Sequence, residues 1–271
     1  MIRPVNGSGM KRMALLNDLS CFGKCSLSVA MPILSACGVE TVPLPTVILS
    51  THTASGFGDY VMRDMTDEMK AFAAHWKKLD VKFDGICTGF FASAEQIRFA
   101  ESFLRDFGGE DTLIVVDPVL GDQGKLYRGF TDAHVDAMRE LCSLADLITP
   151  NRTEAALLAG LSFSSADETL LYAQQVKDAV ITSVGSGNRI GYLARLDGRV
   201  TLVQKESVDM TVHGAGDVFT SALSGELLSS HRPQGLVPHL LICHQFLHHI
   251  GDTGPGRFLF HLHIQRDPDF F

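Results

Sequence analysis

The sequence lacks the features of an exported, membrane-spanning or nucleic-acid-binding protein. It has no apolar run of signal-peptide or membrane-span length, because three prolines interrupt its most apolar stretch, residues 26–50. Basic residues are scarce: 23 Lys and Arg stand against 31 Asp and Glu, and the net charge of −8 has the wrong sign for binding phosphate backbones or anionic lipid. The six cysteines include no Cys-x-x-Cys pair, which favours reduced thiols. We therefore expect a cytoplasmic protein without nucleic-acid or membrane partners.

Hydrophobic residues make up 45% of the 271 residues, which is enough for one substantial core. They occur in two alternating patterns. Short β-rich runs alternate with segments of helical period, such as residues 93–107 and 131–144. This alternation predicts an α/β fold with a mainly parallel sheet. An Asp-Gly turn at 197–198 predicts that the sheet ends in an antiparallel pair. The expected strands are residues 13–17, 41–49, 84–88, 113–117, 146–149, 179–184, 191–195 and 200–204.

The segment His213-Gly-Ala-Gly-Asp217 leads directly into an apolar-periodic stretch that should be a helix. Small residues at a helix N-terminus let backbone N–H groups approach an anion closely, and the helix dipole favours negative charge there. The segment therefore predicts a phosphate or oxyanion site. Asp217 has two interpretations: a cap that complements the dipole, or a base that accepts a proton from a hydroxyl beside the anion.

Two further polar motifs follow expected strands. Asp117 and Asp122 lie on a glycine-punctuated loop after one strand, and Asn151 and Glu154 open a helix after the next. Residues just beyond the carboxyl ends of strands line the ligand crevice of open α/β sheets, and hard oxygen ligands suit Mg²⁺. The structural alternatives are a turn at Asp117 and a capping box formed by Asn151 and Glu154.

Together these motifs resemble those of the pyridoxal/pyridoxamine kinases of the ribokinase superfamily, from about residue 13 to about residue 228. The resemblance implies a ribokinase-like three-layer sandwich, with a mainly parallel central sheet, helices on both faces and an antiparallel edge. Residues 1–12 are then an N-terminal extension, residues 13–230 the kinase domain, and residues 231–271 an atypical C-terminal segment of that domain. The motifs are Asn17-Asp-Leu-Ser-Cys-Phe-Gly23, Pro45-Thr-Val-Ile-Leu-Ser-Thr-His-Thr53, Thr88-Gly-Phe90, Asp117-Pro-Val-Leu-Gly-Asp122, Thr149-Pro-Asn-Arg-Thr-Glu154 and Gly214-Ala-Gly-Asp217.

The resemblance implies ATP-dependent phosphorylation of the 5′-hydroxymethyl group of pyridoxal, pyridoxine or pyridoxamine. By it, Asp217 is the general base, and the anion hole consists of Gly214, Ala215 and Gly216. Mg²⁺ is held by Asp117 and Glu154, with Asn151, partly through water, while the loop 121–129 closes over the nucleotide. The expected ligand contacts are Asp18, Gly23, Thr46, His52 and Phe90 for the vitamer, and Asp122, Tyr127, Asn151 and Thr182 for ATP.

The chain departs from the family at three places. Asp18 stands where many members have serine, which changes the hydrogen bonding near the ring and favours an aminomethyl substrate. Ala215 replaces a frequent threonine but keeps its backbone N–H. The family's acidic, helical ending is not recognisable after about residue 230, which leaves weak adenine binding open.

The resemblance also implies a homodimer. Two alternatives to a B6 kinase stay open: a hydroxymethylpyrimidine kinase with the same aspartate and anion hole, and a protein that binds a B6 vitamer without transferring phosphate.

Overall fold

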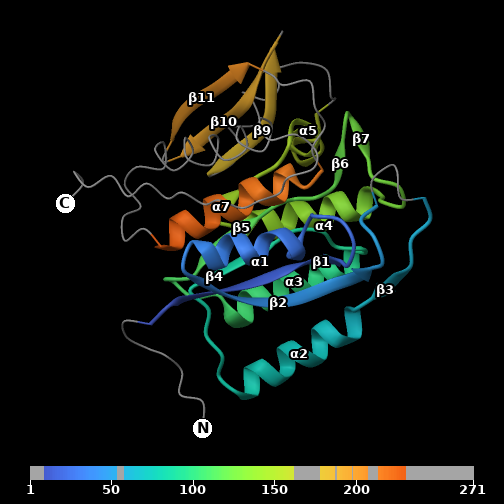
Figure 1. Cartoon of the computed structure of the whole chain (residues 1–271), viewed down its shortest axis with the longest axis vertical. Helices are drawn as coiled ribbons and strands as arrows, with labels where there is room; N and C mark the ends of the chain where they lie inside the picture. Colours follow the sequence, from blue (N-terminus) through green and yellow to red (C-terminus); the bar gives the residue numbers. More distant parts are fainter. Residues whose placement is uncertain are drawn as a thin grey trace, which may run out of the picture.

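The computed structural model describes residues 9–53, 58–161, 178–186, 188–196, 198–206 and 213–229, so the expected C-terminal segment 231–271 lies outside the described residues. Within this part of the chain, nine strands form one sheet in the order β11-β10-β9-β8-β5-β4-β1-β2-β3 (Figure 1). The strands are β1 (Lys11–Ser20), β2 (Val39–Leu49), β3 (Met62–Asp64), β4 (Gly85–Thr88), β5 (Leu113–Val116), β8 (Leu147–Ile148), β9 (Ala179–Ser186), β10 (Arg189–Leu196) and β11 (Arg199–Glu206). The helices are α1 (Leu27–Ala36), α2 (Thr66–Lys78), α3 (Ala94–Phe107), α4 (Asp132–Ser143), α5 (Arg152–Ala159) and α7 (Ala215–Ser229).

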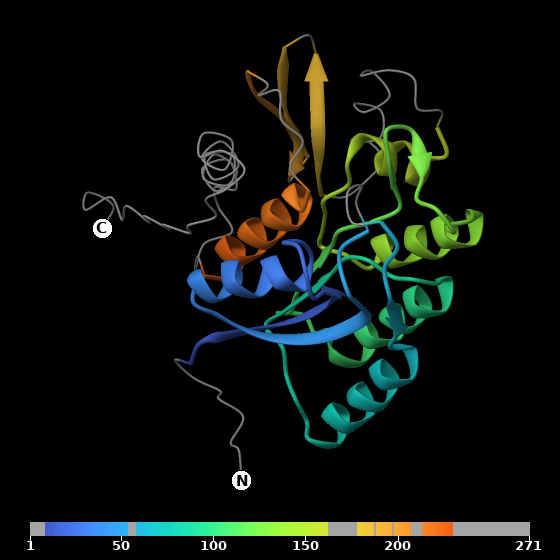
Figure 2. The ribbon, with the colours of Figure 1, turned by 45° about the vertical axis from the view of Figure 1, so that its right-hand side comes forward.

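The predicted α/β class is confirmed by the strand pairing. Strands β2, β1, β4, β5, β8 and β9 run parallel to one another, whereas β3 is antiparallel to β2. The predicted antiparallel edge is also present, because β10 pairs antiparallel with both β9 and β11. These three strands extend past the helices, as the upper part of Figure 2 shows.

The side chains of β1 show how the sheet separates two helical layers. Ala14 and Leu16 belong to the core cluster under α2, α3 and α4, whereas Met13 and Leu15 belong to the cluster under α1 and the end of α7. This alternation follows from the two-residue period of a strand, and both faces are apolar because both are covered. Helices α1 and α7 therefore pack together on one face of the sheet (Figures 1 and 2).

Three short strands were not expected from the sequence. Strand β3 continues the sheet beyond β2, and β6 (Gly121–Asp122) and β7 (Lys125–Leu126) form a separate hairpin. Gln123 and Gly124 connect the hairpin with φ values of 52° and 77°, as a tight two-residue turn with both central residues at positive φ requires. None of the helices in the described ranges has the length and apolar character that a bilayer crossing requires.

Candidate active site

The candidate active site begins at the N-terminus of α7. The N–H of Val218 donates to the carbonyl of Gly214 at 2.9 Å, so the backbone N–H groups of Ala215, Gly216 and Asp217 precede the first intrahelical bond. Gly214 has φ +80°, and a Cβ there would lie 2.6 Å from the carbonyl oxygen of Lys24. Only glycine fits this close approach. The geometry supports the anion site that the sequence predicts.

The carboxyl group of Asp217 lies in this first turn and is partly buried. Burial, with a smaller contribution from the negative charge of Asp18, raises its pKa to about 6, although hydrogen bonds from the Ser26 N–H and the Asn17 side chain act against the increase. Ser26 immediately precedes α1 and has φ 51°, an unusual value for a residue with a side chain. An unusual backbone conformation therefore occurs at the residue whose N–H reaches the candidate base.

Asp117, one of the metal candidates, is electrostatically linked to Asp217. Burial, followed by the charge of Asp217, raises the pKa of Asp117 to about 8. Thr220, one turn after Asp217 on α7, donates its hydroxyl to Asp117 Oδ2 at 3.1 Å and also bonds to the Thr149 hydroxyl at 2.9 Å. The structure thus joins the ends of β5 and β8 to the first turns of α7.

Glu154 is the second metal candidate, and the charge of Asp117 acts on it. Its carboxylate accepts hydrogen bonds from the N–H groups of Asn151 at 2.7 Å and Leu120 at 3.1 Å. Burial raises the pKa of Glu154, and the charge of Asp117 adds to the increase. The Asn151 side chain accepts from the Glu154 N–H at 3.0 Å, so the capping box considered as a structural alternative is present.

The pair Asp117 and Glu154 fits a divalent cation by its chemistry. Both carboxyl groups are buried, and besides burial a neighbouring negative charge raises the pKa of each: Asp217 acts on Asp117, and Asp117 acts on Glu154. A bound cation would relieve this cost. No group of three His, Cys, Asp or Glu side chains in the described ranges forms a complete protein-only metal site. An ion here would therefore need oxygen ligands from water or substrate, as Mg²⁺ commonly has.

The β6–β7 hairpin is tied to α5 from both sides. The Asn151 Nδ2 donates to the Gly121 carbonyl at 2.8 Å, and the Gly124 N–H donates to the Thr153 hydroxyl at 2.9 Å. This hairpin lies within the loop that the sequence analysis expects to close over the nucleotide. Thr182 reaches the same region through its backbone, since its N–H donates to the Pro150 carbonyl at 2.9 Å.

Two of the expected ATP contacts differ in their surroundings. Asp122 is exposed, and its carboxylate accepts from the N–H of Gln123 at 2.8 Å within the hairpin turn. Tyr127 is 41% exposed, and burial of its hydroxyl raises its pKa, with Glu154 and Asp122 adding to the increase. Tyr127 therefore lies in the field of the buried carboxylates Glu154 and Asp117, whereas Asp122 is exposed to solvent.

Asn17, in the C-terminal half of β1 and at the end of the strand expected from the sequence, connects the candidate base to the expected vitamer pocket. Its Nδ2 donates to Asp217 Oδ1 at 3.4 Å, and its Oδ1 accepts from the N–H groups of Asp18 at 2.9 Å and Phe90 at 2.8 Å. The register between β1 and β2 shifts between Asn17 and Leu19, and such bulges re-aim side chains. The sequence analysis did not assign Asn17 a role, although its place at a strand end was a usable signal.

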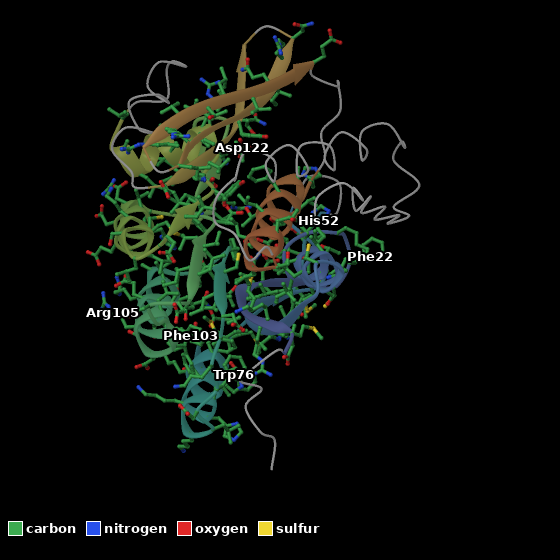
Figure 3. The ribbon with its side chains drawn as sticks, turned by 90° about the vertical axis from the view of Figure 1, so that its left-hand side faces the viewer. Phe22, His52, Trp76, Phe103, Arg105 and Asp122 are labelled. Carbon is green, nitrogen blue, oxygen red and sulfur yellow. The ribbon has the colours of Figure 1, made fainter. Side chains whose placement is uncertain are left out.

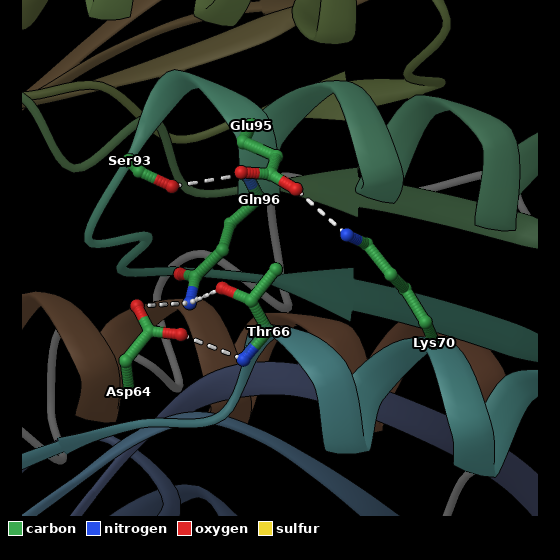
Figure 4. Close-up of polar contacts among 6 residues, drawn as sticks. All are labelled: Asp64, Thr66, Lys70, Ser93, Glu95 and Gln96. Atoms are coloured by element: carbon green, nitrogen blue, oxygen red, sulfur yellow. Dashed lines mark hydrogen bonds and ion pairs between the residues drawn. The ribbon is translucent and has the colours of Figure 1, made fainter.

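Thr46 is held in place by a polar network that includes Gln96, whose contacts with Asp64 and Thr66 are drawn in Figure 4. Its hydroxyl donates to the Phe90 carbonyl at 2.8 Å, and its carbonyl accepts from Gln96 Nε2 at 2.9 Å. Gln96 is fully buried, and the same Nε2 also reaches the Thr66 hydroxyl at 3.0 Å and Asp64 at 3.3 Å. Gln96 is a second positioning residue that the sequence analysis missed, because a single buried glutamine gives no pattern.

The remaining expected vitamer contacts lie together at the start of α1. A Cβ on Gly23, whose φ is +99°, would overlap the His52 ring, so glycine is required there. Burial raises the pKa of Asp18, whose carboxylate accepts from the Ser20 hydroxyl at 3.1 Å. Burial also lowers the pKa of His52, and the ring of His213 lies 5.5 Å from it. Figure 3 shows His52 beside α1, whereas Trp76 lies on α2, lower in the same view.

Comparison with known proteins gives consistent findings. Residues 39–239 match the family model described as phosphomethylpyrimidine kinase. A Bacteroides thetaiotaomicron protein crystallised with pyridoxal is 37% identical, with 92% of this chain and 90% of that chain covered and a TM-score of 0.84. The pyridoxal kinase of Lactobacillus plantarum is 34% identical, with coverage of 90% and 88% and a TM-score of 0.82. The pyridoxine/pyridoxal/pyridoxamine kinase of Bordetella avium is 28% identical over 228 residues, which cover 77% of this chain and 74% of that protein.

Proposed function

The chain belongs to the family of phosphomethylpyrimidine and pyridoxal kinases, a branch of the ribokinase superfamily, and from this membership we propose that it phosphorylates the 5′-hydroxymethyl group of a B6 vitamer with ATP. This activity is that of a pyridoxal kinase. The observation that supports it best is the arrangement at α7, where the carboxyl group of Asp217 lies in the same turn as the backbone N–H groups of Ala215 and Gly216. That arrangement places a base and an anion site in the same turn of α7.

The transfer step can be written with these groups. The vitamer hydroxyl oxygen attacks the γ-phosphorus of ATP, its proton passes to Asp217, and the bond between the γ-phosphorus and the β,γ-bridging oxygen breaks. Backbone N–H groups from Gly214 to Gly216 would stabilise the charge on the transferred phosphoryl group. Asn17 and the Ser26 N–H hold the Asp217 carboxylate in position.

We assign the cation site to Asp117 and Glu154. When bound there, Mg²⁺ would offset negative charge on the phosphate oxygens. The carboxylates themselves position the ion, and Thr220 orients Asp117 through its hydroxyl. The hairpin at residues 121–126, with Tyr127, would cover the phosphates and exclude water.

We assign the vitamer pocket to Asp18, Gly23, Thr46, His52 and Phe90. Asp18 is a buried carboxylate, so it would favour a ligand group that carries positive charge, such as a pyridinium N–H or an aminomethyl ammonium. We therefore propose that pyridoxamine is accepted at least as well as pyridoxal.

The test is a direct assay of ATP consumption with Mg²⁺ and each of pyridoxal, pyridoxine, pyridoxamine and hydroxymethylpyrimidine. Turnover of the B6 vitamers should fall by about 10²–10⁴ in Asp217→Asn, because the base is removed while the shape is kept. Asp106→Asn is the matched control, since this exposed carboxylate pairs with Lys77 at 2.6 Å on α2, away from the site.

Two outcomes would overturn the proposal in different ways. A clear preference for hydroxymethylpyrimidine would favour the second candidate, which the description of the matching family model supports. Pyridoxal binding without any ATP consumption by the wild-type chain would favour a vitamer-binding protein.

The oligomeric state and the location of the enzyme are further proposals. We expect a homodimer in the cytoplasm, as the family resemblance implies. Light scattering coupled to gel filtration would test the dimer, and a monomer at assay concentrations would contradict it.

A further inference from the structure

A continuous group of aromatic rings lies between the two halves of the candidate active site, with Phe130 at its centre. The Phe130 ring is stacked on His134, with centroids 4.5 Å apart and an interplanar angle of 9°. It also lies 5.8 Å from Phe90 and 6.2 Å from Tyr127, the latter edge-on. Such distances are within the range of favourable aromatic pairs.

His134, at one end of this group of rings, is held by the fold. His134 is the third residue of α4, and its Nδ1 accepts from the Thr131 N–H at 3.2 Å as part of a capping box. Its ring is buried. Gly129 has φ +90° directly before Phe130, so the chain turns there in a way that other residues would resist. Phe130 therefore packs on a side chain that is fixed at the start of α4.

The two outer rings, those of Phe90 and Tyr127, lie on the parts of the site that would bind different ligands in the proposed reaction. The backbone of Phe90 is held from both sides, by Asn17 at its N–H and by Thr46 at its carbonyl, on the vitamer side of the site. The N–H of Tyr127 donates to the Leu120 carbonyl at 3.0 Å and closes the hairpin on the nucleotide side. Phe130 contacts both rings, so a shift of either one changes the packing of the other.

We propose that Phe130 is a positioning residue that couples the two ligands, so that binding of the vitamer strengthens binding of the nucleotide and the reverse. This inference rests on the proposed function. The physical reason is that each ligand would fix one of two rings that share the same neighbour, so the second ligand meets a site that is already ordered. Linkage requires the same coupling factor in both directions.

Titration calorimetry on the full chain tests this with pyridoxal and MgADP, a pair that cannot react. In the wild type, saturating MgADP should lower the Kd of pyridoxal by about fivefold or more, and saturating pyridoxal should lower the Kd of MgADP by the same factor. Phe130→Leu, which keeps apolar bulk without a ring, should bring both factors to within about twofold of one. Phe130→Tyr keeps the ring and should restore them.

Phe99→Ala is the matched control. Phe99 is also a partly buried phenylalanine, and its ring lies 6.3 Å from Phe103 on α3, outside the aromatic group around Phe130. This variant should keep the wild-type coupling factor even if its melting temperature falls. Equal coupling in Phe130→Leu and the wild type, or a wild-type factor of one, would overturn the inference while leaving the kinase assignment intact. Failure of the wild type to bind either ligand would refute the proposed function as well.

Discussion

The pH dependence of the reaction should reveal the unusual environment of Asp217. Its pKa is raised to about 6, chiefly by burial and also by the charge of Asp18. The base must be ionised to accept a proton, so kcat/KM should fall as the pH drops through that value. With a pKa of about 6 the ionised fraction is about 90% at pH 7 and about 10% at pH 5, a roughly ninefold loss. An unshifted carboxyl group would lose less than about a tenth over that interval.

Asp18→Asn is the perturbation that isolates the cause. Asparagine has nearly the same shape as aspartate but no charge, so the pKa of Asp217 should decrease and the acid limb should move to lower pH. A like charge near a partly buried group is worth on the order of half to one pKa unit here. The variant should then keep roughly a quarter to a half of its plateau kcat/KM at pH 5, against about a tenth for the wild type.

The assay is kcat/KM for pyridoxal at saturating MgATP, measured from pH 5 to pH 8 and normalised within each protein. Pyridoxal and ATP titrate in this range as well, and Asp18 would itself favour the cationic vitamer, so the acid limb of kcat at saturating pyridoxal is compared alongside kcat/KM. Asp106→Asn removes an exposed carboxylate far from Asp217 and should reproduce the wild-type profile. A wild-type rate that is flat to pH 5, or identical acid limbs in Asp18→Asn and the wild type, would refute the reasoning.

Three other substitutions test the scaffold of the site. A Cβ on Gly89 would lie 2.4 Å from the Asn17 side-chain amide, so Gly89→Ala should lower kcat/KM by about tenfold or more by displacing the group that holds the base; unchanged kinetics would contradict this. Thr220→Val removes the hydroxyl donor to Asp117 and should raise the pKa of that carboxyl group further. Because less of the carboxyl group is then ionised, the Mg²⁺ concentration for half-maximal rate at pH 7 should rise several-fold in a metal titration. Gly214→Ala should lower kcat by about 10²-fold in a turnover assay, because the anion site is displaced. It should also lower the free energy of unfolding by about 1–3 kcal/mol in urea denaturation. A wild-type value of either quantity would count against the anion site.

The fold could be predicted largely from the sequence because its signals are local. All eight expected strands are present, and the helices expected at 93–107 and 131–144 correspond to α3 and α4 within one residue at each end. The strands that were missed, β3, β6 and β7, have only two or three residues, too few for a two-residue period to be recognised. The β6–β7 turn uses Gln123 before Gly124, where the usual signal is Asn or Asp.

The candidate site was predictable only in part. The strand-end rule brought attention to Asp117 and Glu154, and the structure places both in one buried, electrostatically linked group. Asn17 and Thr220 were missed because their partners are 200 and 103 residues away in the chain, and no local pattern encodes such pairs. Thr220 still had one usable signal, its position three residues after Asp217, which places it on the same helical face.

The charges of the site explain why a kinase of this design needs both its cation and its backbone donors. Burial is the largest cause of the raised pKa at Asp117, Glu154, Asp217 and Asp18, and in each of the first three a neighbouring carboxylate adds to it. A triphosphate would bring further negative charge into this group. A divalent cation held by the proposed site at Asp117 and Glu154 would offset this charge, and the N-terminus of α7 would supply positive partial charge. The same excess of negative charge would favour a cationic vitamer at Asp18, so the proposed preferences for metal and for substrate would have one electrostatic origin.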